Sequence, residues 1–257
     1  ALYNKRHGYY MKKNPFGKKG DFITAPNISR LFSEMIAIWI ISFWQSLGSP
    51  KKFNLIELGA GNGEMMKIII ESFQNFPSFL ECCNFVIFEK SPTLIKIQKK
   101  KLGKNKIVWI SELKKVKKNP AIFIGNEFFD AIPIKQFKRK KGIWFENYVN
   151  LENFNKAFFF EKEVNIKDIE KKIHFKISQN QNFIECSELG LNYLRNICNI
   201  IKKNTGGLLL IDYGYTEKKM KNTLQAISNH KFANILEEIG NVDITHNINF
   251  DLYKKFT

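Results

Sequence analysis

The sequence contains few of the residues on which metal and disulfide sites depend. Among its 257 residues there are four histidines and four cysteines. The cysteines (Cys82, Cys83, Cys186 and Cys198) show no C-x-x-C spacing and have no histidine partner nearby in the sequence. Metal ligands normally recur at short fixed spacings, so the sequence predicts no metal site. Scattered thiols are typical of a reducing compartment, and we expect all four to be reduced and mostly buried.

Long apolar segments are also lacking. The amino end is polar and basic, without the apolar core of a signal peptide. The longest apolar run, 35–41, is far shorter than the ~20 residues that cross a membrane. We therefore expect no membrane span, and a location in the bacterial cytoplasm or, for a eukaryotic protein, the mitochondrial matrix. The chain starts at Ala1 and ends at Thr257 without a capped element, which we interpret as a fragment of a longer protein.

Arginine is scarce although the chain is strongly basic. The net charge is +17, yet only Arg6, Arg30, Arg139 and Arg195 are arginine, and the other 37 basic residues are lysine. Asn, Ile and Phe are also abundant, and their codons, like those of lysine, are rich in A and T. The basicity therefore has two open explanations, a biased genome or an acidic partner such as a polyanion or a membrane surface. The sequence predicts no oligomeric state.

The segment around which the chain is organised is 53–64, FNLIELGAGNGE. Its apolar first half predicts a buried parallel strand, and a helical pattern follows directly after it. Between the two stand Gly59, Gly61 and Gly63. A strand, a tight glycine turn and a helix together present backbone N–H groups to a nucleotide-like ligand.

The spacing of the glycines selects among ligands. The dinucleotide fingerprint G-x-G-x-x-G would need a third glycine at position 64, which is Glu64. The segment reads E-x-G-x-G-x-G from Glu57, which resembles the first motif of class I methyltransferases, whose turn makes room for the amino-acid part of S-adenosylmethionine. The next predicted strand supplies Glu89, whose carboxylate can accept hydrogen bonds from both ribose hydroxyls. We predict S-adenosylmethionine as the cofactor; a chance glycine turn and an NAD site are the alternatives.

Strands and helices alternate along most of the chain. This predicts an α/β fold with a doubly wound, mostly parallel sheet and a site at the carboxyl ends of its strands. Residues 1–50 form an expected N-terminal loop and helix that pack on the core, and residues 51–133 and 187–257 form the methyltransferase core. Between 134 and 186, strand-like pieces pair through turns, which predicts an inserted lid on the ligand side.

Four segments together resemble the MidA family of methyltransferases, over nearly the whole chain. They are GDFITAPNISRLFSE, IELGAGNGEMM, GNEFFDAIPIKQF and GGLLLIDYGY. This family includes the mitochondrial assembly factor of respiratory complex I. The resemblance implies a protein-arginine methyltransferase with a protein substrate, which for the mitochondrial member is a complex I subunit.

The resemblance also bears on two parts of the cofactor site. Family members usually carry G-P-G-R-G in the glycine turn, whereas this chain has G-A-G-N-G, so no role of that arginine is carried over. The resemblance and their polar character in an aromatic loop suggest that Asp21 and Thr24 close over the cofactor. Ser111 ends the third predicted strand and could lie beside the adenine ring.

The segment after the fourth predicted strand supplies the catalytic candidates. A carboxylate can hold a guanidinium in a bidentate fork and later accept a proton, and Glu127 and Asp130 suit that task. The amide of Asn126 could contact the cofactor's amino group or the substrate. Alternatively, Glu127 caps a helix and Asp130 pairs with a lysine. The predicted substrate-lining residues are Phe128, Phe129, Asp212 and Tyr213; the phenylalanines could equally be core and Asp212 a turn residue.

Two other function classes stay open. The basic charge favours a nucleic-acid methyltransferase, but base methylases carry Asn/Asp-Pro-Pro-Tyr/Phe after the fourth strand. Here 126–129 reads NEFF, without prolines and with an acid that would repel phosphate, so nucleic acid is the less favoured substrate. The third class is a non-catalytic assembly chaperone that keeps the fold and binds a partner through a basic lid.

Overall fold

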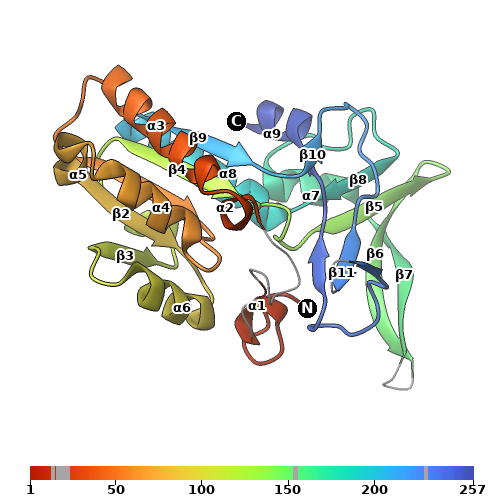
Figure 1. Cartoon of the computed structure of the whole chain (residues 1–257). Coiled ribbons are helices and arrows are strands. Elements are labelled where there is room, and N and C mark those ends of the chain that lie inside the picture. Colours follow the sequence, from red (N-terminus) through yellow and green to blue (C-terminus); the bar gives the residue numbers. More distant parts are fainter. Residues whose placement is uncertain (13–14, 16–23, 153–155, 229–230) are drawn as a thin grey trace. The chain divides into compact units, whose positions relative to one another are not determined.

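The computed structural model describes residues 1–12, 15, 24–152, 156–228 and 231–257. The largest sheet within these residues has five strands. The strand order is β3-β2-β1-β4-β9, and every neighbouring pair is parallel (Figure 1). The prediction of an α/β fold with a mostly parallel central sheet is confirmed. The strands are β1 (Phe53–Leu58), β2 (Cys83–Phe88), β3 (Ile107–Ile110), β4 (Ala121–Asn126) and β9 (Gly206–Ile211).

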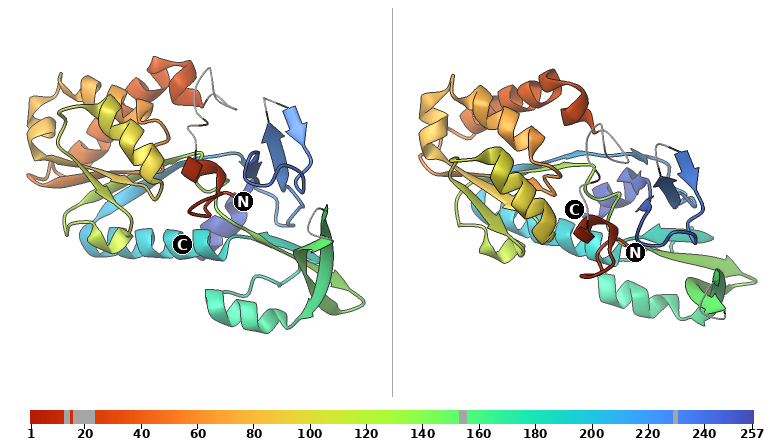
Figure 2. Two further views of the ribbon diagram at one scale, coloured as in Figure 1. Left: turned by 90° about the horizontal axis from the view of Figure 1, so that it is seen from below. Right: turned by 60° about the horizontal axis from the view of Figure 1, so that its bottom comes forward.

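Helices cover both faces of this sheet. Figure 2 shows α3, α4 and α6 on one face and the second half of α8 on the other. All six residues of β1 are buried, as expected of a central parallel strand covered on both faces. Ser91 and Ser187 cap the helices that follow them by accepting hydrogen bonds from Leu94 N (3.2 Å) and Gly190 N (2.8 Å). The helices are α3 (Arg30–Ser46), α4 (Glu64–Phe73), α5 (Pro77–Cys82), α6 (Pro92–Leu102), the 3₁₀ helix η1 (Leu113–Lys115) and α8 (Glu188–Asn204).

Helix α3 packs on the core with part of its apolar side chains. Ile40 and Trp44 are buried in the core cluster. In contrast, Leu31 and Met35 are 62% and 59% exposed, and Trp39 is 38% exposed. The apolar surface of this helix is therefore wider than the part that contacts the core.

The amino end contains more regular structure than its composition indicated. Residues 1–28 were expected to lack regular elements, but two single-turn helices form there, α1 (Tyr9–Lys12) and α2 (Ala25–Ile28). Backbone carbonyls of α1 accept hydrogen bonds from side chains at the start of α6, namely Ser91 Oγ to Tyr10 O (2.7 Å) and Thr93 Oγ1 to Met11 O (2.8 Å). Tertiary hydrogen bonds therefore hold a segment whose sequence shows no periodicity.

The chain divides into two compact units. Unit 1 consists of 1–128 and 196–211 and contains the parallel sheet, and unit 2 consists of 129–195 and 212–257. The predicted lid, 134–186, falls wholly within unit 2, together with residues 212–257 that the sequence pattern had assigned to the core.

Unit 2 contains three small sheets. The four-stranded sheet β7-β6-β5-β8 is antiparallel and carries the strand pairs expected after residue 134. The three-stranded sheet has the order β12-β11-β13, and β10 pairs with β14. The elements are β5 (Lys135–Lys140), β6 (Ile143–Glu152), β7 (Lys156–Val164), α7 (Ile166–Ile173), β8 (Phe183–Cys186), β10 (Gly214–Tyr215), β11 (Gln225–Ser228), β12 (Lys231–Ala233), β13 (Asp243–Thr245), β14 (Ile248–Asn249) and α9 (Phe250–Phe256).

The described residues contain neither a membrane-spanning helix nor a cluster of metal ligands. Within that part of the chain, no helix combines the length and the apolar character that a membrane crossing requires. The same residues contain no group of three or more His, Cys, Asp or Glu side chains placed to hold a metal ion.

Candidate active site

The glycine turn between β1 and α4 has the backbone geometry that its sequence predicted. The φ angles of Gly59, Gly61 and Gly63 are +64°, +51° and +81°, in the left-handed region that side chains disfavour. The Gly59 N–H donates to Phe88 O (2.9 Å), which joins the start of the turn to the end of β2. A Cβ atom at Gly59 would lie 2.8 Å from Phe128 Cδ2, so a side chain there would also displace that ring.

A small pocket lies over this turn, built entirely from residues of unit 1. Its walls come from α2, the end of β1, the turn itself, the start of α4 and the end of β4. Among the described residues that line it, three are glutamates and none is lysine or arginine, in a chain whose net charge is +17. The lining residues are Thr24, Pro26, Asn27, Glu57, Gly59, Ala60, Gly61, Asn62, Glu64, Met65, Asn126 and Glu127.

Two buried oxygen atoms in this pocket have no hydrogen-bond partner among the described residues. They are Glu57 Oε2, at the end of β1, and Asn126 Oδ1, at the end of β4. Glu57 is 3% exposed. Burial raises the pKa of its carboxyl to about 8, and the charge of Glu89 adds to the rise. Buried acceptors are normally satisfied, so two orphaned ones on one pocket indicate a ligand that brings donors.

Glu89 lies at the end of β2, the strand next to β1, and its carboxylate is held by three donors. Oε1 accepts hydrogen bonds from the backbone N–H groups of Lys90 and Ser91, both at 2.9 Å, and Oε2 accepts from Gln98 Nε2 at 3.2 Å. Burial raises the pKa of Glu89, and these three hydrogen bonds oppose the rise. A carboxylate has about four acceptor positions, so capacity for a further donor is left.

Gln98 is a site residue that the sequence reasoning missed. It is fully buried on α6, and its Nε2 donates both to Glu89 Oε2 and to Gly61 O (2.9 Å). Its Oε1 accepts from Trp109 Nε1 at 2.9 Å. This single amide therefore fixes the glycine turn relative to the acid of the second strand. Its only signal in the sequence is a polar residue on the apolar face of a helix, which alone does not indicate a partner.

Asn62 is a second residue without a predicted role. It occupies the turn position where the resembling family usually has arginine, and it is 9% exposed. Its Nδ2 donates to Asn27 Oδ1 at 2.9 Å, and its Oδ1 accepts from Glu64 N at 3.1 Å. The amide thereby joins the glycine turn to α2, which forms the opposite wall of the pocket. Thr24 Oγ1 accepts a hydrogen bond from Asn27 Nδ2 at 2.8 Å, so this predicted cofactor residue belongs to the same hydrogen-bonded chain of side chains.

Glu127 follows β4 and has an unusual backbone. Its φ is +50°, a left-handed conformation that costs a non-glycine residue on the order of 1–3 kcal/mol. Its N–H donates to Ile211 O (2.8 Å), at the end of β9, which holds the residue there. Asn126 Nδ2 donates a hydrogen bond to Glu127 Oε1 at 3.3 Å. Burial raises the pKa of Glu127, while the hydrogen bonds from Asn126 and from the Ala25 backbone oppose the rise.

Of the remaining catalytic and substrate candidates, Phe128 lies in unit 1, and Phe129, Asp130, Asp212 and Tyr213 lie in unit 2. The carboxylate of Asp212 accepts hydrogen bonds from the N–H groups of Phe129 (2.9 Å), Asp130 (3.3 Å) and Tyr213 (2.9 Å). Asp212 therefore organises the turn after β4, which is the alternative that the sequence left open. Asp130 is 7% exposed, and its carbonyl accepts from His246 N at 3.1 Å.

The aromatic candidates differ in their environments. Phe128 is half-buried and contacts Phe88 edge-on, with ring centroids 6.1 Å apart in unit 1. Phe129 is 1% exposed and packs edge-on against Tyr253 at 5.3 Å in unit 2. Tyr213 is 64% exposed. Of the two phenylalanines, the buried Phe129 has the environment of a core residue.

The pocket brings together predicted residues that are far apart in the chain. Thr24, Glu57, Gly59, Gly61, Asn126 and Glu127 line it, whereas Gly63, Glu89 and Ser111 do not. Ser111 is exposed after the end of β3, and Asp21 lies outside the described residues. The assignments of individual residues to cofactor, catalysis and substrate stay predictions.

Comparisons with known proteins place this arrangement in a family. A family model described as "Putative S-adenosyl-L-methionine-dependent methyltransferase" matches residues 35–257. The mitochondrial protein arginine methyltransferase NDUFAF7 of Danio rerio is 28% identical over 279 residues, covering 99% of this chain and 66% of that protein. Its Homo sapiens counterpart is 28% identical over 282 residues, with 99% and 63% covered. The chain thus spans slightly less than two thirds of the curated relatives it matches.

A solved structure gives the same fold. It is a crystal structure from Burkholderia thailandensis, described as a methyl transferase candidate bound to S-adenosyl-homocysteine. It is similar to this chain with a TM-score of 0.79 at 19% identity, covering 99% of this chain and 68% of that one. With the family model matching most of the sequence, the chain belongs to this family of S-adenosylmethionine-dependent methyltransferases.

Proposed function

We propose that this chain binds S-adenosylmethionine in the pocket over the glycine turn and transfers its methyl group to arginine of a protein substrate. The relatives named as protein arginine methyltransferases and the Burkholderia structure with its bound S-adenosyl-homocysteine support the cofactor and the substrate class. The finer proposal is a complex I subunit as substrate, which rests on the resemblance to the mitochondrial assembly factor.

The observation that carries the proposal is the pair of orphaned acceptors, Glu57 Oε2 and Asn126 Oδ1, on one pocket. The amino-acid part of S-adenosylmethionine carries an ammonium group, which offers three N–H donors and a positive charge. Such a group would satisfy both acceptors and favour the ionised form of Glu57. The glycine turn, held open by three residues with positive φ, leaves its backbone accessible to the cofactor.

The charge of the pocket favours a cationic ligand over a phosphate. The part of its lining that the structure describes includes Glu57, Glu64 and Glu127 without a lysine or arginine, so a pyrophosphate or a nucleic-acid backbone would be repelled there. The paired lysine of Glu64, Lys101, is not part of the lining. This argues against the NAD and nucleic-acid alternatives.

When bound, the cofactor supplies an activated methyl group, and this chain's residues would supply position and proton control. Glu127 stands at the rim with its pKa raised by burial. Its carboxylate can hold the N–H groups of a guanidinium, which is protonated at all relevant pH values, and accept the proton that the product loses. Asn126 donates to Glu127 and keeps an unpaired oxygen towards the pocket, so it would orient the acid relative to the cofactor.

The decisive test is a calorimetric titration of the chain with S-adenosylmethionine, with NADH as the control ligand. We expect saturable binding of the first alone, weakened about tenfold or more in Glu57→Gln, because the isosteric amide removes the charge. Methylthioadenosine, which lacks the amino-acid part, should bind the wild type and Glu57→Gln equally. Binding of S-adenosylmethionine that Glu57→Gln leaves intact would contradict the assignment of the ammonium group to this pocket.

The arginine step needs a separate measurement. Candidate substrate proteins would be incubated with the chain and labelled cofactor, and methylated arginine would be identified by mass spectrometry. Cofactor binding without methylation of any arginine would favour the alternative of an assembly chaperone that keeps the methyltransferase fold.

A further inference from the structure

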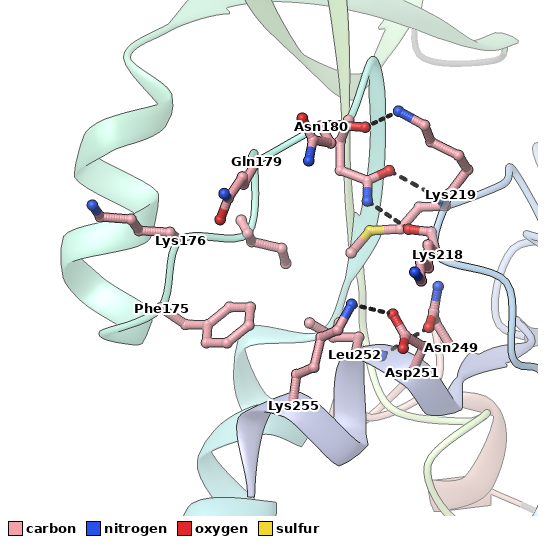
Figure 3. Close-up of a pocket in the computed structure, with 13 residues that line it drawn as sticks. Phe175, Lys176, Gln179, Asn180, Lys218, Lys219, Asn249, Asp251, Leu252 and Lys255 are labelled. Carbon is pink, nitrogen blue, oxygen red and sulfur yellow. Dashed lines mark hydrogen bonds and ion pairs between the residues drawn. The ribbon is translucent and has the colours of Figure 1, made fainter.

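A second, larger cavity lies within unit 2 and is not explained by methyl transfer. Its volume is about 670 Å³, within the range of small-ligand sites. Three segments form it: the stretch 175–181 between α7 and β8, the loop 218–220 after β10, and the α9 region from 249 to 255 (Figure 3).

Hydrogen bonds join two of these segments, 175–181 and 218–220, so that wall of the cavity is fixed before any ligand arrives. Gln181 Nε2 donates to Lys218 O at 2.7 Å, and Met220 N donates to Gln181 Oε1 at 3.0 Å. The ammonium of Lys219 donates to Asn180 O, and Asn180 has a positive φ of 60°. Three contacts across one gap indicate a preformed site, which a ligand occupies at a low entropic cost.

Apolar side chains contribute to the lining and are themselves supported. Phe175 lines the cavity, and its ring lies 5.7 Å from that of Phe256 in an edge-on contact. The guanidinium carbon of Arg195 lies 4.8 Å from the centroid of the Phe256 ring, and the guanidinium also donates a hydrogen bond to Ile173 O. Ile177, Met220 and Leu252 are the other apolar lining residues.

Positive charge dominates the rim. Four of the thirteen lining residues are lysine, compared with 37 of the 257 residues in the chain, so the enrichment exceeds the general lysine bias. Asp251 is the one acid in the lining, and Lys255 neutralises it at 2.6 Å. Lys176 and Lys218 are exposed and have no ion pair within the described parts of the chain.

We propose that this cavity, formed by residues 175–181, 218–220 and 249–255, binds a short acidic segment of a protein. Figure 3 shows its lysines on different sides of the cavity rather than converging on one point. A single phosphate needs convergent donors, whereas spread lysines suit an elongated ligand with several carboxylates. The amide side chains of Gln179 and Asn180 suit peptide N–H and C=O groups, and the apolar lining suits an apolar residue between the acids. A role in docking the methylation substrate rests on the proposed function; the binding itself does not.

The test measures binding directly, without cofactor or methylation. The probe is a fluorescein-labelled peptide of Asp and Glu residues around one Phe, followed by fluorescence anisotropy on the full chain. The pocket variant is Lys176→Glu with Lys218→Glu. The matched control is Lys167→Glu with Lys171→Glu, which changes the net charge equally on exposed positions of α7 outside the cavity. Thermal unfolding of both variants verifies that the fold is retained.

We expect the pocket variant to weaken the peptide about tenfold or more, and the control variant by less than about twofold. The counterpart peptide with Asn and Gln in place of the acids should not bind. Equal losses in the two variants would reduce the effect to net charge and overturn the proposal. Displacement of the peptide by inorganic phosphate, or tighter binding of a single-stranded RNA that the same variant abolishes, would also overturn it. Because no cofactor is present, failure here leaves the S-adenosylmethionine titration unaffected.

Discussion

The two cavities of this protein have opposite electrostatic character. Counting described residues only, the pocket in unit 1 is lined by three glutamates and no basic residue, and the cavity in unit 2 by four lysines and one neutralised acid. In unit 1 burial raises the pKa of Glu57 to about 8, and the charge of Glu89 adds to the rise. In unit 2 the four lysines are exposed.

This difference shows that the net charge of a chain does not predict the charge of its sites. A net charge of +17 suggested a polyanion partner, yet three glutamates line the pocket at the carboxyl ends of the parallel strands. A biased codon usage would place lysines wherever water tolerates them, but it would not bury glutamates against their desolvation cost. The buried acids are therefore the stronger evidence of function.

The largest expected effect is at the glycine turn. Gly61→Val places a β-branched side chain at φ +51° beside the pocket, so we expect S-adenosylmethionine binding to weaken more than ~100-fold. The control is Gly48→Val, at a φ of +81° with no atom within 4 Å of the new Cβ, which imposes similar backbone strain away from the site. Calorimetry on both variants would measure the affinities. Equal weakening in both would mean that strain alone, and not the occupied turn, explains the loss.

A slightly smaller effect, on the methylation rate alone, is expected from a substitution of Glu127. Glu127→Gln should lower the methylation rate about 100-fold, as loss of a general base does, while cofactor affinity changes less than about threefold. Glu81→Gln, on the exposed side of α5, is the control for an amide substitution in the same unit. Single-turnover rates with saturating cofactor separate the two quantities. A loss of affinity without a loss of rate would move Glu127 from the catalytic step to cofactor binding.

The sequence predicted the glycine turn and the acids at the strand ends better than the rest of the molecule. Glu57, Glu89 and Glu127 were placed correctly at strand ends because parallel strands bring their carboxyl ends to one edge, which is a rule of topology. The glycine turn was predictable because left-handed backbone favours one residue type. Both features are local in the sequence or follow from the order of strands.

The remaining features depend on contacts that no local pattern encodes. Gln98 joins Gly61 to Glu89 only because α6 packs back on the turn, and Asn62 meets Asn27 only because α2 forms the opposite wall. The cavity in unit 2 is assembled from three segments whose residues are separated by up to 80 positions in sequence, between 175 and 255. Its lysines were indistinguishable from the general lysine bias until the fold brought them together.

A tenfold effect is expected from pH on cofactor affinity. A bound ammonium lowers the pKa of Glu57 from its value of about 8 in the free protein, so binding releases a proton and strengthens as pH rises. Between pH 6 and 7.5, below the pKa of ~7.7–8.0 of an α-amino group, affinity should rise about tenfold. Glu57→Gln should abolish this slope. An affinity independent of pH in the wild type would show that Glu57 does not meet the cation.

The last effect concerns the free energy of unfolding, which the buried carboxyl of Glu57 should lower at neutral pH. In the unfolded chain the carboxyl of Glu57 ionises near its ordinary pKa, whereas in the folded chain it keeps its proton to about pH 8. The folded state therefore binds more protons in that window, and stability falls as pH rises from about 4.5 to 8. Glu57→Gln should match the wild type near pH 4, where the carboxyl is mostly protonated in the folded and the unfolded chain, and exceed it by about 3 kcal/mol at pH 7 in urea unfolding without cofactor. Lys218→Gln, in the exposed cavity of unit 2, should differ from the wild type by less than ~0.5 kcal/mol at both pH values. A wild type as stable as Glu57→Gln at pH 7 would show that the carboxyl ionises without cost, and the contrast between the buried acids and the exposed lysines would then be one of location and not of energy.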